Sequence, residues 1–341
     1  MPTIQDVAKY CGVSKATISR VLNNRPGRVS IETRERILQA IRDLNYRPVR
    51  GHRDASAPLS ITLGIAGGLP GSELLNSGYH RSIVNSILAS IANSRQMALM
   101  FHDYLWTGDA TANIRRYCDG RCEGIILIAP PLDLPLISRL QERGFPFVLV
   151  NYSDQTGLLP YCDIDNIPCA IIAVNELLEH HHKRIGYLRG PAASSASLQR
   201  EEGYRQALEA AGIPVDENLI SPPTENYGDE QGWLHTVLSL PASQRPTGIF
   251  CFSDKNAEVA IKVAAALKLN VPQDLSIVGF DDQEPMSSDL RLTTIHQPYQ
   301  EITNRALAAL LTQITGTGNA QQQVIVHGEL IRRQSVADAP S

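Results

Sequence analysis

The body of this chain alternates short apolar runs with amphipathic helical segments, and this alternation constrains the fold more than any other feature. It predicts the α/β class, in which parallel sheets are covered by helices on both faces. The predicted strands are Leu63–Ala66, Ala98–His102, Gly124–Ile128, Phe147–Asn151, Arg184–Leu188, Gly248–Phe252 and Ser276–Phe280. The clearest helical segments are Ile83–Asn93, Ala170–His180, Arg200–Ala211 and Asn256–Lys268.

The first 48 residues follow a different pattern, that of three short helices. Thr3 with Asp6 starts a capping box, Gly12 permits a turn, and Ser14 and Ser30 can cap the second and third helices. The apolar positions expected inside are Ile4, Val7, Ala8, Val13, Ile18, Val21, Leu22, Ile37, Leu38, Ile41 and Leu44. The residues left on the outer face of the second helix are Lys15, Ala16, Ser19 and Arg20. This all-α arrangement predicts a helix-turn-helix domain whose second helix enters the DNA major groove.

Charge is distributed unevenly and supports DNA binding at the N-terminal end. Residues 1–53 hold eleven Lys and Arg against four Asp and Glu, whereas residues 54–341 hold 20 against 31. A basic head on an acidic body is typical of phosphate contact confined to one end of a protein.

The segment VAKYCGVSKATISRVLNNRPGRVSIETRERILQAIRDLNYRP resembles the headpiece of the LacI/GalR family of bacterial transcription regulators. By that resemblance Lys15, Ala16 and Arg20 read base edges. Lys and Arg fit guanine O6 and N7, whereas Ala can contact only a thymine methyl group. The other positions that the resemblance assigns to phosphate or base contact are Thr3, Ser14, Thr17, Asn23, Ser30, Thr33 and Tyr46.

The resemblance continues through RIGYLRGPAASSASLQREEGYRQAL, VPQDLSIVGFDD and LTTIHQP. It implies a core with the two-lobed fold of periplasmic sugar-binding proteins, with a ligand between the lobes. We expect a headpiece at 1–48, a hinge at 49–60 and an effector-binding and dimerisation core at 61–338. The first lobe would take about 61–161 and 291–321, and the second about 162–290 and 322–338.

Six residues match effector-binding positions of the family: Tyr79, Asp165, Arg200, Tyr227, Ser253 and Asp281. A guanidinium group, two carboxylates and two aromatic rings suit a polyhydroxylated ring, which would be that of a sugar, a sugar phosphate or a nucleoside. The loop Gly67–Gly78, which precedes Tyr79, is longer than usual in the family.

The hinge departs from the family pattern. Ala55 stands where relatives have a Leu that wedges into the minor groove, and a methyl group is a poor wedge. Gly51 and Asp54 weaken a hinge helix, while Arg50 and Arg53 add positive charge. We therefore expect a poorly helical, basic hinge that kinks DNA less.

The resulting hypothesis is a cytoplasmic, homodimeric repressor of a catabolic or transport operon. It would bind a near-palindromic operator and respond to an effector, with no cofactor and no metal. The N-terminus shows no signal peptide, no run is long enough to span a membrane, and the scattered cysteines fit a reducing compartment. The tail after Leu330 lacks leucine heptads, which favours a dimer over a tetramer.

Two alternatives remain at this point. The core could bind a partner protein, or nothing, in place of a small molecule. The other alternative is an NAD-dependent enzyme. It is suggested by the glycine-rich segment GIAGGLPG at 64–71, which follows a predicted strand, but it is the more distant of the two. The glycine spacing of this segment differs from the dinucleotide-binding pattern, and no catalytic motif accompanies it.

Overall fold

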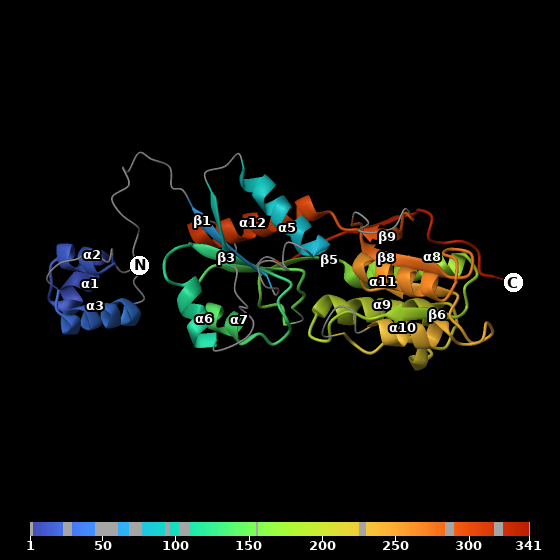
Figure 1. The fold of residues 1–341 in the computed structure, drawn as a ribbon. Helices are drawn as coiled ribbons and strands as arrows, with labels where there is room; N and C mark the ends of the chain where they lie inside the picture. Colours follow the sequence, from blue (N-terminus) through green and yellow to red (C-terminus); the bar gives the residue numbers. More distant parts are fainter. Residues whose placement is uncertain are drawn as a thin grey trace. The chain divides into compact units, whose positions relative to one another are not determined.

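The computed structural model describes residues 3–22, 29–44, 61–67, 77–92, 96–101, 110–154, 156–224, 230–283, 290–316 and 323–340. The chain forms two compact units, Met1–Leu59 and Ser60–Ser341, each with its own core (Figure 1). The first unit is helical, and the second has two sheets covered by helices.

The N-terminal unit contains α1 (Ile4–Cys11), α2 (Lys15–Leu22) and α3 (Ile31–Asp43). The predicted capping box is present: the Thr3 backbone N–H donates to Asp6 Oδ2 at 2.6 Å, and the Asp6 N–H donates to Thr3 Oγ1 at 3.3 Å. Gly12 ends α1 with a φ of +62°, a left-handed conformation that glycine adopts at little cost.

Seven buried side chains form the core of this unit: Val7, Ala8, Cys11, Ile18, Val21, Ile37 and Ala40. Leu38, which was predicted to be inside, is 38% exposed, so this prediction is wrong. Each helical residue is rotated about 100° from its neighbour, so a helix with Ile37, Ala40 and Ile41 facing inward turns Leu38 toward solvent.

The first sheet of the larger unit has the order β10-β5-β4-β3-β1-β2, and all its strand pairs are parallel. Its strands are β1 (Thr62–Gly67), β2 (Met97–Phe101), β3 (Gly124–Ile128), β4 (Phe147–Val150), β5 (Tyr161–Ile164) and β10 (Gln323–Val326). Helices α5 (Gly78–Ile91) and α12 (Tyr299–Thr315) cover one face, while α6 (Ala110–Tyr117) and α7 (Pro135–Glu142) cover the other. We call this sheet and its helices the first lobe.

The second sheet has the order β11-β9-β8-β7-β6, with one antiparallel pair, β9 with β11. Its strands are β6 (Ile185–Leu188), β7 (Gly248–Cys251), β8 (Ser276–Asp281), β9 (Thr293–His296) and β11 (Glu329–Ile331). Helices α8 (Asn166–Glu179) and α9 (Ser195–Ala210) cover one face, and α10 (Glu230–Leu238) and α11 (Asp254–Ala266) the other. This sheet and its helices are the second lobe.

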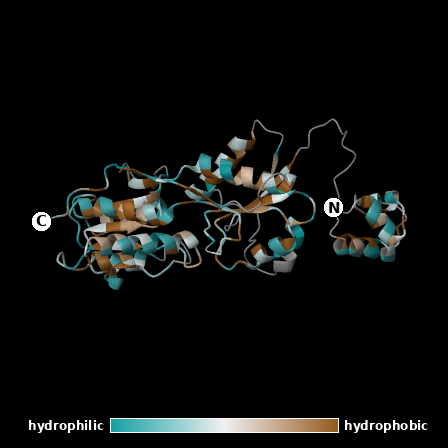
Figure 2. Ribbon diagram, turned by 180° about the vertical axis from the view of Figure 1, so that it is seen from behind, coloured by the Kyte–Doolittle hydropathy of each residue, from teal (hydrophilic) through white to brown (hydrophobic). Residues whose placement is uncertain are grey.

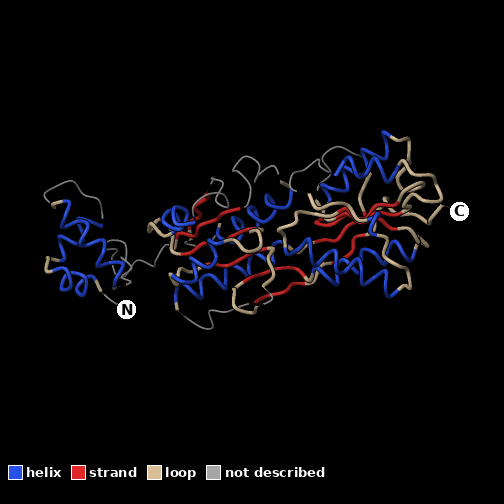
Figure 3. Tube along the Cα trace, turned by 90° about the horizontal axis from the view of Figure 1, so that it is seen from below, coloured by secondary structure: helices blue, strands red, loops and turns tan. Residues whose placement is uncertain are grey.

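The predicted α/β architecture is confirmed, because the sheets lie between helical layers and their hydrophobic residues follow the strands (Figures 2 and 3). The close packing of α8 on α9 depends on Gly203, where a Cβ atom would lie 2.5 Å from the Ile167 carbonyl oxygen. All seven predicted strands are present in β1–β4 and β6–β8, and the four predicted helices are α5, α8, α9 and α11.

The chain passes between the lobes three times, and each passage comes a few residues later than expected. Residues 161–164 and 323–326 pair in the first sheet as β5 and β10, although their larger part was assigned to the second lobe. Residues 293–296 pair in the second sheet as β9, although they were assigned to the first. The backbone pairing of β5, β9 and β10 continues to the edge of each lobe, and the points where this pairing ends mark the passages between the lobes.

Candidate functional site

The exposed face of α2 carries the residues predicted to read DNA bases. Lys15, Ala16 and Arg20 are exposed, while Ile18 and Val21 on the opposite face pack into the core. The helix therefore presents two cations and a methyl group on one accessible surface. An exposed basic face opposite a packed apolar one is the geometry that a recognition helix needs to enter a major groove.

A serine–threonine pair lies at the start of each of the helices α2 and α3. Ser14 Oγ lies 2.9 Å from Thr17 Oγ1 and accepts from the Thr17 N–H at 3.2 Å. Ser30 Oγ donates to Thr33 Oγ1 at 2.8 Å and accepts from the Thr33 N–H at 3.2 Å. Ser14 and Ser30, both predicted to contact phosphate, thus act as helix caps, as Thr3 does. The predicted residues Asn23, Tyr46, Arg50, Arg53 and Ala55 lie outside the described residues.

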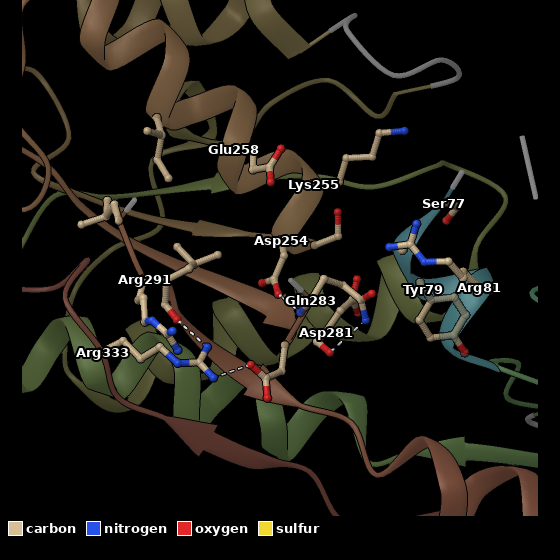
Figure 4. Close-up of a pocket in the computed structure, with 16 residues that line it drawn as sticks. Ser77, Tyr79, Arg81, Asp254, Lys255, Glu258, Asp281, Gln283, Arg291 and Arg333 are labelled. Atoms are coloured by element: carbon tan, nitrogen blue, oxygen red, sulfur yellow. Dashed lines mark hydrogen bonds and ion pairs between the residues drawn. The ribbon is translucent and has the colours of Figure 1, made fainter. Parts of the chain in front are cut away.

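A cavity of about 230 Å³ opens between the two lobes of the larger unit (Figure 4). The N-terminal ends of α5 and α11 and the end of β8 surround it. Its charged and polar lining residues are Ser77, Tyr79, Arg81, Ser253, Asp254, Lys255, Glu258, Asp281, Asp282, Gln283, Arg291 and Arg333. Three of the six predicted effector residues, Tyr79, Ser253 and Asp281, line this cavity.

Asp281 lies at the carboxyl end of β8 and is only 5% exposed. Gln297 Nε2 donates to its Oδ1 at 2.7 Å, and the Tyr299 hydroxyl donates to its carbonyl oxygen at 2.7 Å. Its φ of +120° is unusual for a residue with a side chain and persists because these contacts fix the backbone. Burial raises the pKa of the Asp281 carboxyl, and the nearby Arg200 guanidinium opposes this shift.

Arg200 lies beneath the cavity wall and does not line the cavity. The residue is 1% exposed, and its guanidinium carbon lies 3.5 Å from the centre of the Phe280 ring and 4.7 Å from that of Phe252. Its Nε donates to Asn166 Oδ1 at 2.9 Å and its Nη1 to the Phe252 carbonyl oxygen at 2.5 Å. Arg200 Nη1 is 3.9 Å from Asp281 Oδ1, which makes it a support for that carboxylate.

Asp165 is directed to the crossing between β10 and β11. Its Oδ1 accepts from the Gly328 N–H at 3.1 Å and from Cys169 Sγ at 3.0 Å, and its Oδ2 lies 2.7 Å from His327 Nδ1. It does not line the described cavity. Its carboxylate instead ties the last crossing segment to the start of α8. Tyr227, the sixth predicted residue, lies outside the described residues.

The structure adds cavity residues that sequence reasoning did not identify. Asp254, in the first turn of α11, accepts from Thr294 Oγ1 at 2.6 Å and from the Gln283 N–H at 2.7 Å, and burial raises the pKa of its carboxyl group. Ser253, beside it, caps α11 by accepting from the Asn256 N–H. An acidic residue directly after a capping serine was the available signal for Asp254, whereas nothing in the local sequence marks Gln283.

The cavity is rich in charges of both signs. Arg333 pairs with Asp282 at 2.6 Å, while the Arg81 and Arg291 guanidiniums form no ion pair with another part of the chain that the structure describes. All six cysteines are free thiols, and the described ranges contain no group of three His, Cys, Asp or Glu residues arranged to hold a metal ion. Within the same ranges, no helix combines the length and the apolar character that crossing a bilayer requires.

An exposed basic recognition helix and a polar cavity between two lobes, in one chain, define a DNA-binding regulator of the two-lobed class. Residues 3–49 match the bacterial regulatory proteins of the lacI family, and residues 174–336 match the periplasmic binding protein-like domain. The chain belongs to the LacI family of bacterial transcription regulators.

Curated relatives agree along the full length. The HTH-type transcriptional repressor PurR of Photorhabdus laumondii is 30% identical over 345 residues, covering 100% of this chain and 98% of that protein. PurR of Yersinia pestis is 30% identical over 343 residues, with the same coverage.

Solved structures match as well. The complex of the regulator CelR with cellobiose is 26% identical, with a TM-score of 0.73 over 98% of this chain and 100% of that one. The lac repressor dimer bound to operator and the anti-inducer ONPF has a TM-score of 0.70 over 98% and 99% of the two chains. At 24% identity, the latter shows the shared fold alone.

Proposed function

We propose that this protein is a homodimeric repressor that binds a near-palindromic operator and is controlled by a small polyhydroxylated effector. The observation that carries the proposal is the presence, in one chain, of a basic recognition helix and a cavity that two lobes share. Dimer symmetry would place two α2 helices on the two half-sites of an operator. The regulated genes would be those of a catabolic or transport operon.

Lys15 and Arg20 would read sequence, since both are exposed on the face of α2 opposite the core. Each can donate to guanine O6 and N7, whereas Ala16 offers only a methyl group to thymine. With Ala55 in the hinge as a poor minor-groove wedge, bending of the operator would contribute less to specificity. The two cations would then carry a larger share of it.

The effector would sit against Asp281, Ser253 and Tyr79. A carboxyl group, a hydroxyl group and an aromatic edge from both lobes suit the hydroxyl groups of a sugar, a sugar phosphate or a nucleoside. Arg200 would act through Asp281, because it is buried beneath that carboxylate. Asp165 receives no effector contact in this proposal, because its oxygens are engaged at the crossing segment.

Control would operate through the geometry of the lobes. An effector that binds between them favours one lobe angle, and this angle sets the spacing of the two headpieces on DNA. The coupling is reciprocal, so operator binding changes effector affinity by the same factor.

Selection of binding sites from a random DNA library tests the DNA-reading part of this proposal. Arg20→Ala should lower the affinity for the selected site by roughly 10- to 100-fold and relax the preference at one base position per half-site. Lys9→Ala removes one positive charge from α1 of the same domain and serves as the control. It should weaken binding to all sequences equally. If Arg20→Ala kept the full preference, the assignment of Arg20 to base reading would be wrong.

A further inference from the structure

Gln283 lies in the second lobe, and its side chain forms hydrogen bonds with residues of the first lobe. Its N–H donates to Asp254 Oδ2 at 2.7 Å, which anchors the residue to α11. Its Oε1 accepts from Ser82 Oγ of α5 at 3.2 Å, and its Nε2 donates to the Tyr299 hydroxyl at the start of α12 at 2.7 Å. The carboxamide therefore joins the second lobe to α5 and to the start of α12 in the first lobe, and Figure 4 shows the residue between Asp254 and Tyr79.

The carboxamide group rests on the bare backbone of Gly78. A Cβ atom at Gly78 would lie 2.6 Å from Gln283 Oε1 and 3.2 Å from its Cδ. Heavy atoms do not approach so closely, so any residue larger than glycine at position 78 must displace the glutamine side chain. The displaced group is the far end of a flexible side chain, and α5 itself needs no rearrangement. Gly78 is thus the complementary surface for Gln283.

The lobes also touch at other loops, through two backbone N–H groups of the first lobe. The Leu132 N–H donates to the Ala193 carbonyl oxygen at 2.7 Å, and the Ser153 N–H donates to Ser195 Oγ at 3.1 Å. Neither contact involves Gln283 or its partners. These two amides therefore report on the separation of the lobes independently of the residue whose role is in question.

We propose that Gln283, seated on Gly78 and bonded to Ser82 and Tyr299, is a latch that holds the two lobes at their spacing. It is a positioning residue, since its contacts are with protein groups of both lobes. Rigid-body closure of two lobes is set by the few contacts that bridge them. Here one side chain supplies two of the bridging hydrogen bonds.

The latch lines the same cavity as Asp281 and Tyr79, so a ligand that enters the cavity contacts it. A ligand that draws the Gln283 carboxamide away from Ser82 and Tyr299 releases the lobes, and one that packs against the carboxamide in place stabilises them. Because a ligand shifts a conformational equilibrium only through its differential contacts, the latch determines the sign of the response. This regulatory role rests on the proposed control by an effector, whereas the hydrogen bonds that Gln283 forms between the lobes do not depend on that proposal.

Amide hydrogen exchange on the full chain, without DNA or effector, tests the latch. The variants are Gln283→Ala, which removes the carboxamide, and Gly78→Ala, which displaces it while placing a better helix former at the start of α5. Gln300→Ala is the matched control. Gln300 Nε2 donates to Ser90 Oγ at 2.6 Å, so it joins a glutamine of α12 to a serine of α5 within the first lobe only.

We expect exchange at Leu132 and Ser153 to be roughly five- to ten-fold faster in both latch variants, as the loss of one or two hydrogen bonds implies. Gln300→Ala should leave both amides at the wild-type rate. Unchanged exchange in the two latch variants, or an equal increase in Gln300→Ala, would overturn the proposal. Because no effector is present, neither result depends on whether the cavity binds one.

Discussion

At the scale of single residues, Asp281 and Arg200 form a buried charge pair but differ in their access to the cavity between the lobes. Asp281 and Arg200 were both predicted as effector contacts, and only Asp281 reaches the cavity. Arg200 is enclosed by Phe252 and Phe280, and those rings come from other strands and loops. A motif gives the identity and order of residues, whereas burial depends on contacts between distant segments. Whether a side chain lines the cavity or supports a residue that lines it was therefore not readable from the sequence.

Three buried carboxyl groups of the larger unit predict an unusual pH dependence of stability. Burial raises the pKa of Asp163 to about 7 and raises those of Asp254 and Asp281 as well. Each group therefore keeps a proton in the folded state at pH values where the unfolded chain has released it. The resulting stability is complete below about pH 4 and is lost as pH rises through the raised pKa.

Asp281→Asn tests this dependence because the amide keeps an oxygen for the bond from Gln297 and cannot ionise. Between pH 5 and 7, the free energy of unfolding of the wild type should fall more steeply than that of Asp281→Asn, by up to about 1 kcal/mol per pH unit. Urea unfolding at several pH values measures both slopes. Asp154→Asn is the control, since hydrogen bonds from residues 156–159 hold the pKa of Asp154 below its usual value, outside this range. Parallel curves for wild type and Asp281→Asn would contradict the expectation.

At the scale of elements, the seven predicted strands are apolar runs, whereas two of the four described strands that were missed, β5 and β9, carry buried polar residues. Strand β9 contains Thr293 and Thr294, which are fully buried yet bonded to Ser335 and Asp254. Strand β5 contains the buried Asp163. Hydrophobic periodicity detects strands by their apolar faces, so buried polar strands give no such signal. Leu38 is the opposite error, an apolar residue at a near-helical spacing that faces solvent.

The first turn of α2 gives an element-scale prediction, because Ser14 combines a capping role with a predicted phosphate contact. Ser14→Ala removes the cap and should cost the headpiece about 1 kcal/mol of stability. Ser14→Asp keeps a capping oxygen and should restore that stability, yet its negative charge beside a phosphate should lower DNA affinity further than Ala does. Hydrogen exchange in α2 and fluorescence anisotropy with DNA measure the two effects. If Ser14→Asp bound DNA as tightly as wild type, Ser14 would not lie near a phosphate.

At the scale of the whole molecule, the alternation of strands and helices predicted parallel sheets, and the family resemblance alone predicted their division into two lobes. The chain leaves and re-enters each lobe. Strand β10 therefore pairs at the edge of the first sheet and β11 at the edge of the second, although only two residues separate them. Pairings between segments more than 150 residues apart leave no local pattern. The latch has the same origin, since Gln283 meets Ser82 across 201 positions of the chain.

The C-terminal segment shows how such long-range pairing stabilises one lobe. Ser335 is fully buried; its Oγ accepts from the Thr293 N–H at 2.8 Å and donates to the Ile277 carbonyl oxygen at 2.5 Å. His182 holds the same segment, with Nε2 3.0 Å from the Ala337 carbonyl oxygen. Ser335 in the C-terminal segment therefore forms hydrogen bonds with both β8 and β9 of the second lobe.

Ser335→Ala leaves a buried N–H and a buried carbonyl group without these partners, so it should destabilise the second lobe by about 1–3 kcal/mol. Hydrogen exchange should accelerate in β8 and β9 and stay unchanged in β1 and β3, because the lost bonds all lie in the second sheet. Ser90→Ala is the control. Its hydroxyl bonds Ser86 and Asn304 near the surface of the first lobe, where water can replace the lost bonds. Equal losses of stability in the two variants would show that the tail contributes no more than a surface contact.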